Sequence, residues 1–291
     1  MARLLLPPAT ALVLGVAACT ATATPAGGTG RITSGGIERT FAVHVPPSRP
    51  ASLPVLLVFH GAGGTGSDMQ GLGFNAWADS LGFLAVYPDA APGTRGTWAL
   101  GCNQCTWADV AGVDDYRFTQ DLIDSLAARY PVDRARLFAT GHSLGGSFAF
   151  DLACHVPGLF AGTAVSSSLP SMEELPLCTT GQMPLRVITS AGTSDANVPW
   201  NGGPGGSGAT YQGAESTASY WAARGSCEST PARRDLPDQN HDGEVVHVVE
   251  YTACAGGGFV RFFKVDGMGH SWPAIADLDL TREIANSFFT R

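Results

Sequence analysis

The sequence predicts an α/β protein with a mostly parallel central sheet and helices on both faces. Strand-like apolar runs alternate with helix-like segments through the middle of the chain, and this alternation is typical of parallel sheets that helices cover. Hydrophobic residues make up 44% of the 291 residues and charged residues 14%, a balance that excludes a disordered chain. The 37 glycines and 19 prolines indicate many turns around a large core.

The first expected elements are a hairpin and two buried strands. Residues 31–34 and 37–45 flank Gly35-Gly36, a spacing that predicts a β-hairpin. The continuous apolar runs 53–59 and 83–87 are typical of strands that are buried on both faces. These four segments supply the first strands of the expected sheet.

Helices and strands then alternate to the end of the chain. Residues 115–130 carry apolar side chains at helical spacing, and Pro131 follows their end. Residues 136–140 predict the next strand, and residues 144–155 predict the helix after it. The remaining expected elements are strands at 160–166, 185–189, 245–251 and 259–265, with helices at 217–223 and 278–289.

The first 30 residues predict export. Residues 1–18 carry the positive Arg3 and an apolar stretch, as in a signal peptide of the lipoprotein type. The closing sequence Val16-Ala-Ala-Cys19 is similar to a bacterial lipobox, which predicts lipidation of Cys19; an ordinary cleaved signal is the alternative. Residues 19–30 suit a flexible tether. We therefore expect residues 31–291 to form a single domain of a secreted or lipid-anchored bacterial protein outside the cytoplasm.

Six further cysteines predict disulfides. Their number is even, and an exported chain meets an oxidising compartment. Six cysteines allow 15 connectivities, among which the sequence does not choose. A redox or zinc motif at Cys102 and Cys105 is the less favoured alternative, because zinc needs more close Cys or His ligands. The six are Cys102, Cys105, Cys154, Cys178, Cys227 and Cys254.

The net charge of −8 argues against two classes of partner. Nucleic acids and anionic membrane surfaces both attract clustered Lys and Arg, whereas this chain has a single lysine, Lys264, and no basic cluster. We expect no nucleic-acid partner, and membrane contact only through a lipid at Cys19. The sequence does not predict an oligomeric state.

A G-x-S-x-G motif marks the candidate nucleophile. Gly141-His-Ser143-Leu-Gly145 lies between the expected strand 136–140 and the expected helix 144–155. A sharp strand-to-helix turn needs small residues on both sides, and it lifts the serine hydroxyl clear of the sheet. This placement predicts that Ser143 is a nucleophile.

Two further residues complete a predicted triad. A serine hydroxyl needs a histidine base and a carboxylate that orients it, here in the chain order Ser, Asp, His. Asp195 follows the expected strand 185–189, and His270 follows the expected strand 259–265. Because the carboxyl ends of parallel strands meet at one edge of a sheet, we expect Ser143, Asp195 and His270 to lie together.

The segment after the strand 53–59 predicts an oxyanion hole. His60-Gly61-Ala62 follows this strand directly, and such a turn can offer a backbone N–H to a developing oxyanion. We assign the two donors to the amides of Ala62 and Leu144. This chemistry needs neither a metal nor another cofactor, and none is expected.

Together these motifs resemble the polyhydroxybutyrate depolymerase and feruloyl esterase group of α/β-hydrolases. The resemblance covers nearly the whole mature chain and is most specific in its last motif. The residues that carry it are Phe59-His-Gly61, Tyr87-Pro-Asp89, Val113-Asp-Asp115, Gly141-His-Ser-Leu-Gly-Gly146, Gly192-Thr-Ser-Asp195, Val198-Pro199 and Gly269-His-Ser-Trp-Pro273.

The resemblance implies a secreted serine esterase that acts on hydroxyalkanoate or hydroxycinnamoyl esters, small or polymeric. It also implies a disulfide pairing of Cys227 with Cys254 and of Cys154 with Cys178, which leaves Cys102 for Cys105. An acetyl xylan esterase is an alternative, as is an acyltransferase with the same triad. A non-catalytic binding lipoprotein would be expected to lack a triad member, and none is missing.

The substrate cleft is expected to be open. Residues 166–184 are too few and too rich in proline for a large lid domain. Trp200 and Trp272 lie near Asp195 and His270 in the sequence, so they are candidates for contacts with the acyl group. Core packing is their alternative role. His60, and Trp98 in the long loop 89–114, are further candidate substrate contacts.

Residues 238–243 match the first half of a calcium loop. Such a loop needs a glutamate at its twelfth position, which here is Val249. We therefore favour a turn at Asp242-Gly243 that leads into the strand 245–251, with calcium binding as the alternative.

Overall fold

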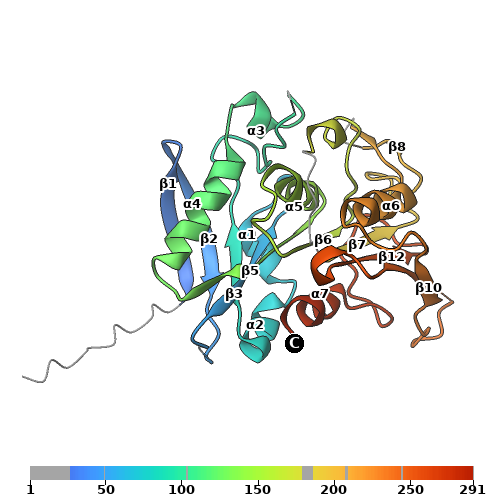
Figure 1. The fold of residues 1–291 in the computed structure, drawn as a ribbon. Coiled ribbons are helices and arrows are strands. Elements are labelled where there is room, and N and C mark those ends of the chain that lie inside the picture. Colours follow the sequence, from blue (N-terminus) through green and yellow to red (C-terminus); the bar gives the residue numbers. More distant parts are fainter. Residues whose placement is uncertain are drawn as a thin grey trace, which may run out of the picture.

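The computed structural model describes residues 27–48, 50–102, 104–178, 186–206, 209–243 and 245–290. The predicted signal peptide, Cys19 and most of the predicted tether lie outside these residues. A ten-stranded sheet runs through the described part, in the order β1-β2-β4-β3-β5-β6-β7-β12-β11-β10 (Figure 1). The strands are β1 Gly28–Ser34, β2 Ile37–His44, β3 Leu53–Phe59, β4 Leu84–Pro88, β5 Val132–His142, β6 Gly162–Ser166, β7 Arg186–Gly192, β10 Ala232–Asp235, β11 Val246–Tyr251 and β12 Phe259–Val265.

The centre of the sheet is parallel and its edges are antiparallel. Strands β4, β3, β5, β6, β7 and β12 pair in parallel. The hairpin of β1 and β2 closes one edge, and β11 and β10 close the other. All the carboxyl ends of the six central strands therefore lie at one edge of the sheet, where side chains from distant segments can meet.

Helices cover both faces of the sheet. Helices α4, α5 and α6 contribute to one apolar cluster, and α1, α2 and α7 contribute to the other. Alternate residues of β3 enter the two clusters, Leu57 on one face and Leu56 on the other, because successive side chains of a strand point in opposite directions. The helices are α1 Gly66–Gln70, α2 Phe74–Leu81, α3 Trp107–Val110, α4 Asp115–Ala127, α5 Leu144–His155, α6 Ala214–Arg224 and α7 Leu280–Phe289.

This architecture confirms the predicted fold class, and it differs from the sequence prediction in several elements. Strand β1 begins at Gly28 and pairs Gly28 with Val43, so the hairpin reaches into the range predicted as tether. Helices α1 and α2 were not predicted; Gly71 and Gly73 interrupt the pattern there, and Gly73 has a φ of 88°. The four-residue edge strand β10 and the short helix α3 were also missed.

Short elements surround the carboxyl edge of the sheet. The described residues between β6 and β7 contain one 3₁₀ turn, Leu175–Leu177, and no lid domain. The glycine-rich segment after β7 forms a small second sheet of β8 Gly203–Pro204 and β9 Thr210–Tyr211. It is joined to the segment after β6, because the Met172 amide donates a hydrogen bond to the Thr210 carbonyl oxygen.

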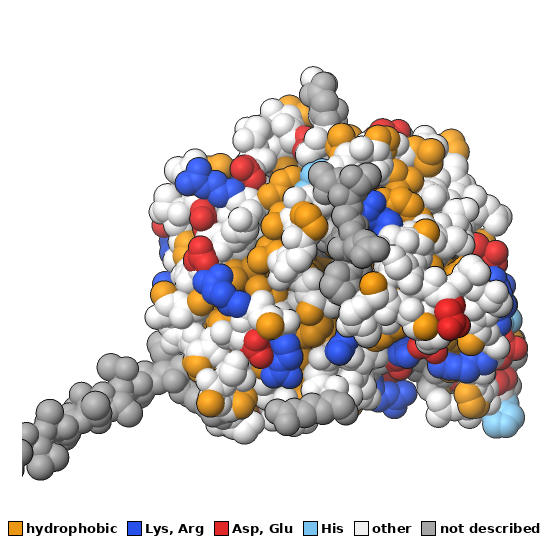
Figure 2. Space-filling model, viewed as in Figure 1, with side chains coloured by type: hydrophobic (Ala, Val, Ile, Leu, Met, Phe, Trp, Pro, Cys, Tyr) orange, Lys and Arg blue, Asp and Glu red, His pale blue; other side chains and the backbone are white. Residues whose placement is uncertain are grey.

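Three disulfides are present, in the pairing that the resemblance implies. Cys102 is bonded to Cys105, Cys154 to Cys178, and Cys227 to Cys254. Among the described residues, no helix is both long and apolar enough to span a bilayer. On the face shown in Figure 2, the Lys and Arg side chains are dispersed among hydrophobic and acidic ones.

Candidate active site

The turn between β5 and α5 presents Ser143. This residue has a φ of 54° and a ψ of −126°, a strained conformation that costs about 1 to 3 kcal/mol. The neighbouring glycines permit the turn: a Cβ atom at Gly145 would lie 2.3 Å from the Phe59 carbonyl oxygen, and one at Gly141 would lie 2.3 Å from the Gly145 carbonyl carbon. The close approach of α5 to β3 therefore requires glycine at position 145, and its close approach to β5 requires glycine at position 141.

The three residues of the predicted triad meet at the carboxyl edge of the sheet. His270 Nε2 lies 2.8 Å from Ser143 Oγ, and His270 Nδ1 lies 2.8 Å from Asp195 Oδ2. Asp195 is buried, and its Oδ1 accepts hydrogen bonds from the amides of Asn197 and Val198. These bonds fix the carboxylate. Asp195 Oδ2 then accepts a hydrogen bond from the Nδ1–H group of His270, which leaves Nε2 as the acceptor that faces Ser143.

The predicted oxyanion donors lie beside Ser143. Ala62 and Leu144 line the same cleft as Ser143. Within the part of the chain that the structure describes, their amides donate no backbone hydrogen bond, whereas the Ser143 amide is bonded to the Ser166 carbonyl oxygen. The amides of Ala62 and Leu144 are thus available to a ligand.

His60 supports this loop from behind. It is 1% exposed, its Nδ1 lies 2.8 Å from the Gly61 carbonyl oxygen, and its Nε2 accepts a hydrogen bond from the Ala90 amide. Because Nε2 is an acceptor here, Nδ1 carries the proton and the ring is neutral. Burial lowers the pKa of His60, which maintains that neutral form. His60 therefore orders the loop; its burial does not fit the predicted substrate contact.

A second histidine, the partly buried His142, directly precedes Ser143. Its ring centre lies 5.1 Å from that of His270, and its Nε2 is buried without a hydrogen-bond partner among the described residues. The pKa of His142 is lowered to about 4, mainly by burial and to a smaller extent by the proximity of His270. A neutral neighbour avoids repulsion when His270 becomes protonated.

None of the three tryptophans predicted to contact substrate lines the Ser143 cleft. Trp98 is fully buried, and its Nε1 donates a hydrogen bond to the His60 carbonyl oxygen. Trp272 packs against Phe74 and donates a hydrogen bond to Thr281 Oγ1. Trp200 lines a separate cavity of about 360 Å³ with Lys264. For Trp200 and Trp272, closeness in sequence to Asp195 and His270 did not decide which way the rings point.

The cleft at Ser143 has a volume of about 450 Å³. Its apolar side includes Trp107, a half-exposed ring under the Arg95 guanidinium, and Tyr211 of β9. Sequence reasoning missed these residues, although Trp107 lies in the loop that it identified as long enough to be functional. The lining residues are Ala62, Thr97, Leu100, Gln104, Cys105, Thr106, Trp107, Ser143, Leu144, Ser147, Ser171, Glu173, Glu174, Ala209 and Tyr211.

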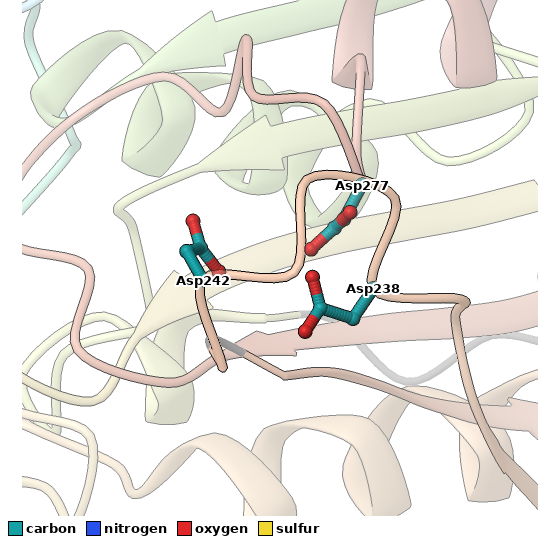
Figure 3. Close-up of side chains that lie close together, drawn as sticks. All are labelled: Asp238, Asp242 and Asp277. Atoms are coloured by element: carbon teal, nitrogen blue, oxygen red, sulfur yellow. The ribbon is translucent and has the colours of Figure 1, made fainter.

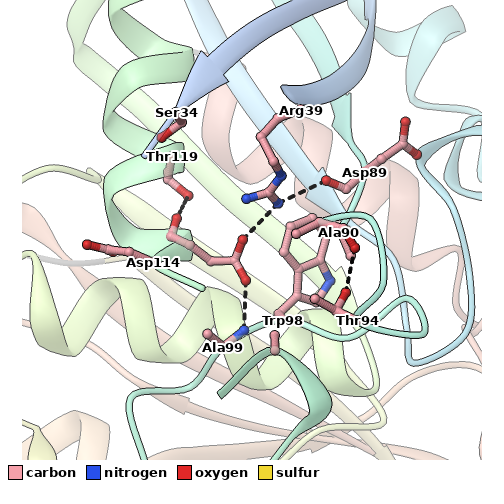
Figure 4. Close-up of polar contacts among 12 residues, drawn as sticks. Ser34, Arg39, Asp89, Ala90, Thr94, Trp98, Ala99, Asp114 and Thr119 are labelled. Carbon is pink, nitrogen blue, oxygen red and sulfur yellow. Dashed lines mark hydrogen bonds and ion pairs between the residues drawn. The ribbon is translucent and has the colours of Figure 1, made fainter. Parts of the chain in front are cut away.

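A buried ion pair holds both ends of the loop that carries Trp107. Arg39 Nη2 lies 2.7 Å from Asp115 Oδ1. It also donates a hydrogen bond to the Asp89 carbonyl oxygen (Figure 4). The other carboxylate oxygen of Asp115 accepts a hydrogen bond from the Ala99 amide. Breaking a buried pair by removing one partner costs about 3 to 5 kcal/mol, so these contacts fix the loop strongly.

The segment with the calcium-like pattern forms the predicted turn. The Gly243 amide, at a φ of 82°, donates a hydrogen bond to Asp238 Oδ2. The fold also brings Asp277 to this turn, so that ligand oxygens of Asp238, Asp242 and Asp277 lie within 4.8 Å of one another (Figure 3). Asp277 comes from a distant segment, which is why the sequence pattern did not reveal the third carboxylate.

Comparison with known proteins identifies relatives of the chain. Residues 33–249 match the family model "Esterase". Poly(3-hydroxyalkanoate) depolymerase C of Paucimonas lemoignei is 24% identical over 79% of this chain and 58% of its own length. Feruloyl esterase B of Piromyces equi is 28% identical over 75% of this chain and 39% of its own. The bifunctional acetylxylan esterase/xylanase XynS20E of Neocallimastix patriciarum is 26% identical over 84% and 32%.

The chain therefore matches roughly a third to three-fifths of the length of these curated relatives. Among solved structures, the acetyl xylan esterase from Aspergillus awamori superimposes with a TM-score of 0.62 at 15% identity, covering 90% of this chain and 99% of that one. This likeness shows the fold, and the family match extends over well over half of the chain. The chain belongs to the esterase family and has the α/β-hydrolase fold.

Proposed function

We propose that this protein is a secreted serine esterase that hydrolyses carboxylic esters through Ser143, His270 and Asp195. The observation that carries the proposal is the hydrogen-bonded series from Ser143 Oγ through His270 to Asp195, placed at a cleft with two available backbone amides. Esterases that form an acyl-enzyme use this arrangement. The names of the relatives support the same reaction.

The first half of the reaction forms the acyl-enzyme. Ser143 Oγ attacks the ester carbonyl carbon while its proton passes to His270 Nε2. The negative charge on the carbonyl oxygen is stabilised by the amides of Ala62 and Leu144. The tetrahedral intermediate then collapses, and the leaving alcohol takes the proton from His270. Asp195 holds the ring orientation and stabilises the imidazolium throughout.

Water completes the reaction. A water molecule attacks the acyl carbon and gives one proton to His270 Nε2, and the same two amides stabilise the second oxyanion. Collapse releases the carboxylic acid, and Ser143 Oγ regains the proton. No metal or other cofactor takes part in the proposed steps.

The substrate class is proposed from the cleft and the relatives. A volume of about 450 Å³ with Trp107, Leu100 and Tyr211 in its lining accommodates more than an acetyl group. This favours hydroxyalkanoate or hydroxycinnamoyl esters over acetyl xylan. Rates on 3-hydroxybutyrate oligomers, methyl ferulate and acetylated xylan decide among the three. Cleavage of short p-nitrophenyl esters alone would contradict both favoured classes.

Export and the single-domain arrangement remain part of the proposal. We propose that residues 1–18 direct export, that Cys19 carries a lipid, and that residues 31–291 form one catalytic domain. Three disulfides support an oxidising compartment. Metabolic labelling with a palmitate analogue should mark the full-length chain and not a Cys19→Ser variant.

Labelling with a fluorophosphonate probe tests the proposed nucleophile. The probe phosphonylates an activated serine, so the wild-type protein should react and a Ser143→Ala variant should not. Ser147→Ala is the matched control, because Ser147 lines the same cleft one helical turn further along α5 and should not be needed for labelling. Labelling that persists in Ser143→Ala would contradict the assignment.

A further inference from the structure

Glu174 is a buried acid in the wall of the cleft, and the proposed reaction does not use it. It is 8% exposed and separates the Ser143 cleft from a small cavity on its other side, which Asp151 and Trp221 help to line. Glu174 Oε2 accepts a hydrogen bond from the Ser171 amide, and the Glu174 amide donates one to Ser171 Oγ. These reciprocal bonds fix the position of the carboxyl group at the cleft.

The surroundings of Glu174 contain a second acid, Asp151. Asp151 lies on the other side of Glu174, in the lining of the small cavity. Its carboxylate accepts a hydrogen bond from the Tyr116 hydroxyl and pairs with His155. No Lys or Arg is among the described residues that line the Ser143 cleft. The pKa of Glu174 is raised to about 8, mainly by burial and to a smaller extent by the charge of Asp151. At neutral pH the group is therefore mostly protonated, and it can donate as well as accept a hydrogen bond.

The cleft joins this acid to apolar walls. Trp107 and Leu100 come from the long loop 89–114, and Tyr211 comes from β9. The long loop also contributes the polar residues Thr97, Gln104 and Thr106. Ser147 of α5 is hydrogen-bonded to Ser168, and the segment that follows Ser168 supplies Ser171 and Glu174. A ligand that fills such a cleft has an apolar body and a polar group that pairs with the buried acid.

We propose that Glu174 is a specificity-determining residue that hydrogen-bonds a hydroxyl group on the acyl part of the substrate. The enzyme then prefers an acyl group with a hydroxyl over the same group without it, because the analogue offers the buried carboxyl group no hydrogen-bond partner. This inference rests on the proposed esterase function and adds the residue that recognises the acyl group.

The test compares two matched substrate pairs on the full-length protein. The pairs are methyl 4-hydroxycinnamate with methyl cinnamate, and methyl 3-hydroxybutyrate with methyl butyrate. We expect the wild-type kcat/KM to favour the hydroxylated member of one pair by about tenfold or more, and Glu174→Leu to remove that preference. Because the ratio is taken within one variant, a partial loss of folded protein cancels.

Two variants serve as controls. Glu174→Gln keeps a donor and an acceptor of similar shape, so it should retain the preference. Glu173→Leu removes an exposed acid that lines the same cleft, and it should leave the ratio unchanged. An unchanged ratio in Glu174→Leu would overturn the inference. A wild-type protein that shows no preference in either pair would also overturn it, and this measurement does not depend on whether Glu174→Leu folds.

Hydrolysis of p-nitrophenyl acetate separates this inference from the proposed function. The acetyl group has no hydroxyl, so its hydrolysis should depend on Ser143 and hardly on Glu174. A wild-type protein that hydrolyses no ester, or a Ser143→Ala variant as active as the wild type, would contradict the proposed function itself. Ser143-dependent hydrolysis without a hydroxyl preference would contradict only the role of Glu174.

Discussion

The end of the sheet that holds Ser143 and the rim of the cleft are built in different ways. At the sheet, strands β3, β5, β6, β7 and β12 end side by side, and a glycine, Gly145, lets α5 approach β3 closely. At the rim, three segments meet whose described residues form only short regular elements: 89–102 with 104–114, 167–178, and 200–206 with 209–213. The first region places reacting atoms through the regular backbone of the sheet.

The rim depends instead on individual long-range contacts. The Arg39 and Asp115 pair fixes the long loop, and a hydrogen bond from Met172 to Thr210 joins the other two segments. Loops carry much of the variation in function among proteins of one fold, because a rigid scaffold tolerates changes in them. We therefore expect changes near the sheet to abolish the reaction or the fold, and changes at the rim to alter substrate preference.

The largest expected effect follows from Asp195→Asn. The amides of Asn197 and Val198 would bind the side-chain oxygen, which leaves the NH₂ group facing His270 Nδ1. The ring would then carry its proton on Nε2 and could not accept the Ser143 proton, so kcat should fall by roughly 10⁴-fold. Steady-state kinetics with p-nitrophenyl acetate measure this, with an unchanged thermal melt as the control. A loss of less than tenfold would count against the role of Asp195.

Gly145→Ala should destabilise the same region strongly. The added methyl group would meet the carbonyl oxygens of Phe59 and His60 at 2.3 and 2.5 Å, and backbone atoms cannot move aside easily. We expect a loss of about 3 kcal/mol or more in the free energy of unfolding, measured by urea denaturation. Gly269→Ala is the matched control, since nothing lies within 4 Å of a Cβ there. Equal stability of the two variants would show that α5 does not need this close approach.

His142 makes the sheet region sensitive to acid. Its pKa is about 4 in the folded protein, below the ordinary value of 6.5. As the pH falls from 6.5 toward 4, the unfolded chain takes up a proton that the folded protein does not, so stability present above pH 6.5 is lost in this window. The loss approaches about 3 kcal/mol near pH 4.

His142→Gln should therefore flatten the dependence of unfolding free energy on pH between 6.5 and 4. His241→Gln, a change at an exposed histidine, should keep the slope of the wild-type protein. Urea denaturation at several pH values measures both. Parallel curves for His142→Gln and the wild-type protein would assign the acid sensitivity to other groups.

The smallest expected effect lies at the rim. Trp107→Ala removes an aromatic wall of the cleft, so KM for methyl ferulate should rise by about fivefold, with hydrolysis of methyl acetate nearly unchanged. Val110→Ala is the control, because Val110 is exposed on the same short helix and does not line the cleft. A Trp107→Ala variant that loses activity on both esters equally would place Trp107 in the support of the sheet region instead.

Sequence patterns predicted the parallel sheet because buried strands such as β3 are continuous apolar runs. They missed α2, although Phe74, Ala78 and Leu81 have helical spacing, because glycines interrupt the pattern on its N-terminal side. They also grouped Ser143, Asp195 and His270 correctly in space, since each follows a strand whose end lies at the same edge. A residue in the turn after a central strand is held near the edge at which that strand ends.

The sequence by itself determined the fold class, the order of the central elements and the residues that meet at Ser143. Only the tertiary structure decided which side chains line the cleft: Trp107 and Glu174 do, whereas Trp98 is fully buried. The physical reason is the range of the forces involved. Periodicity and glycine requirements act over a few residues and are visible in the chain, but the direction of a loop side chain depends on contacts with segments far away in the sequence.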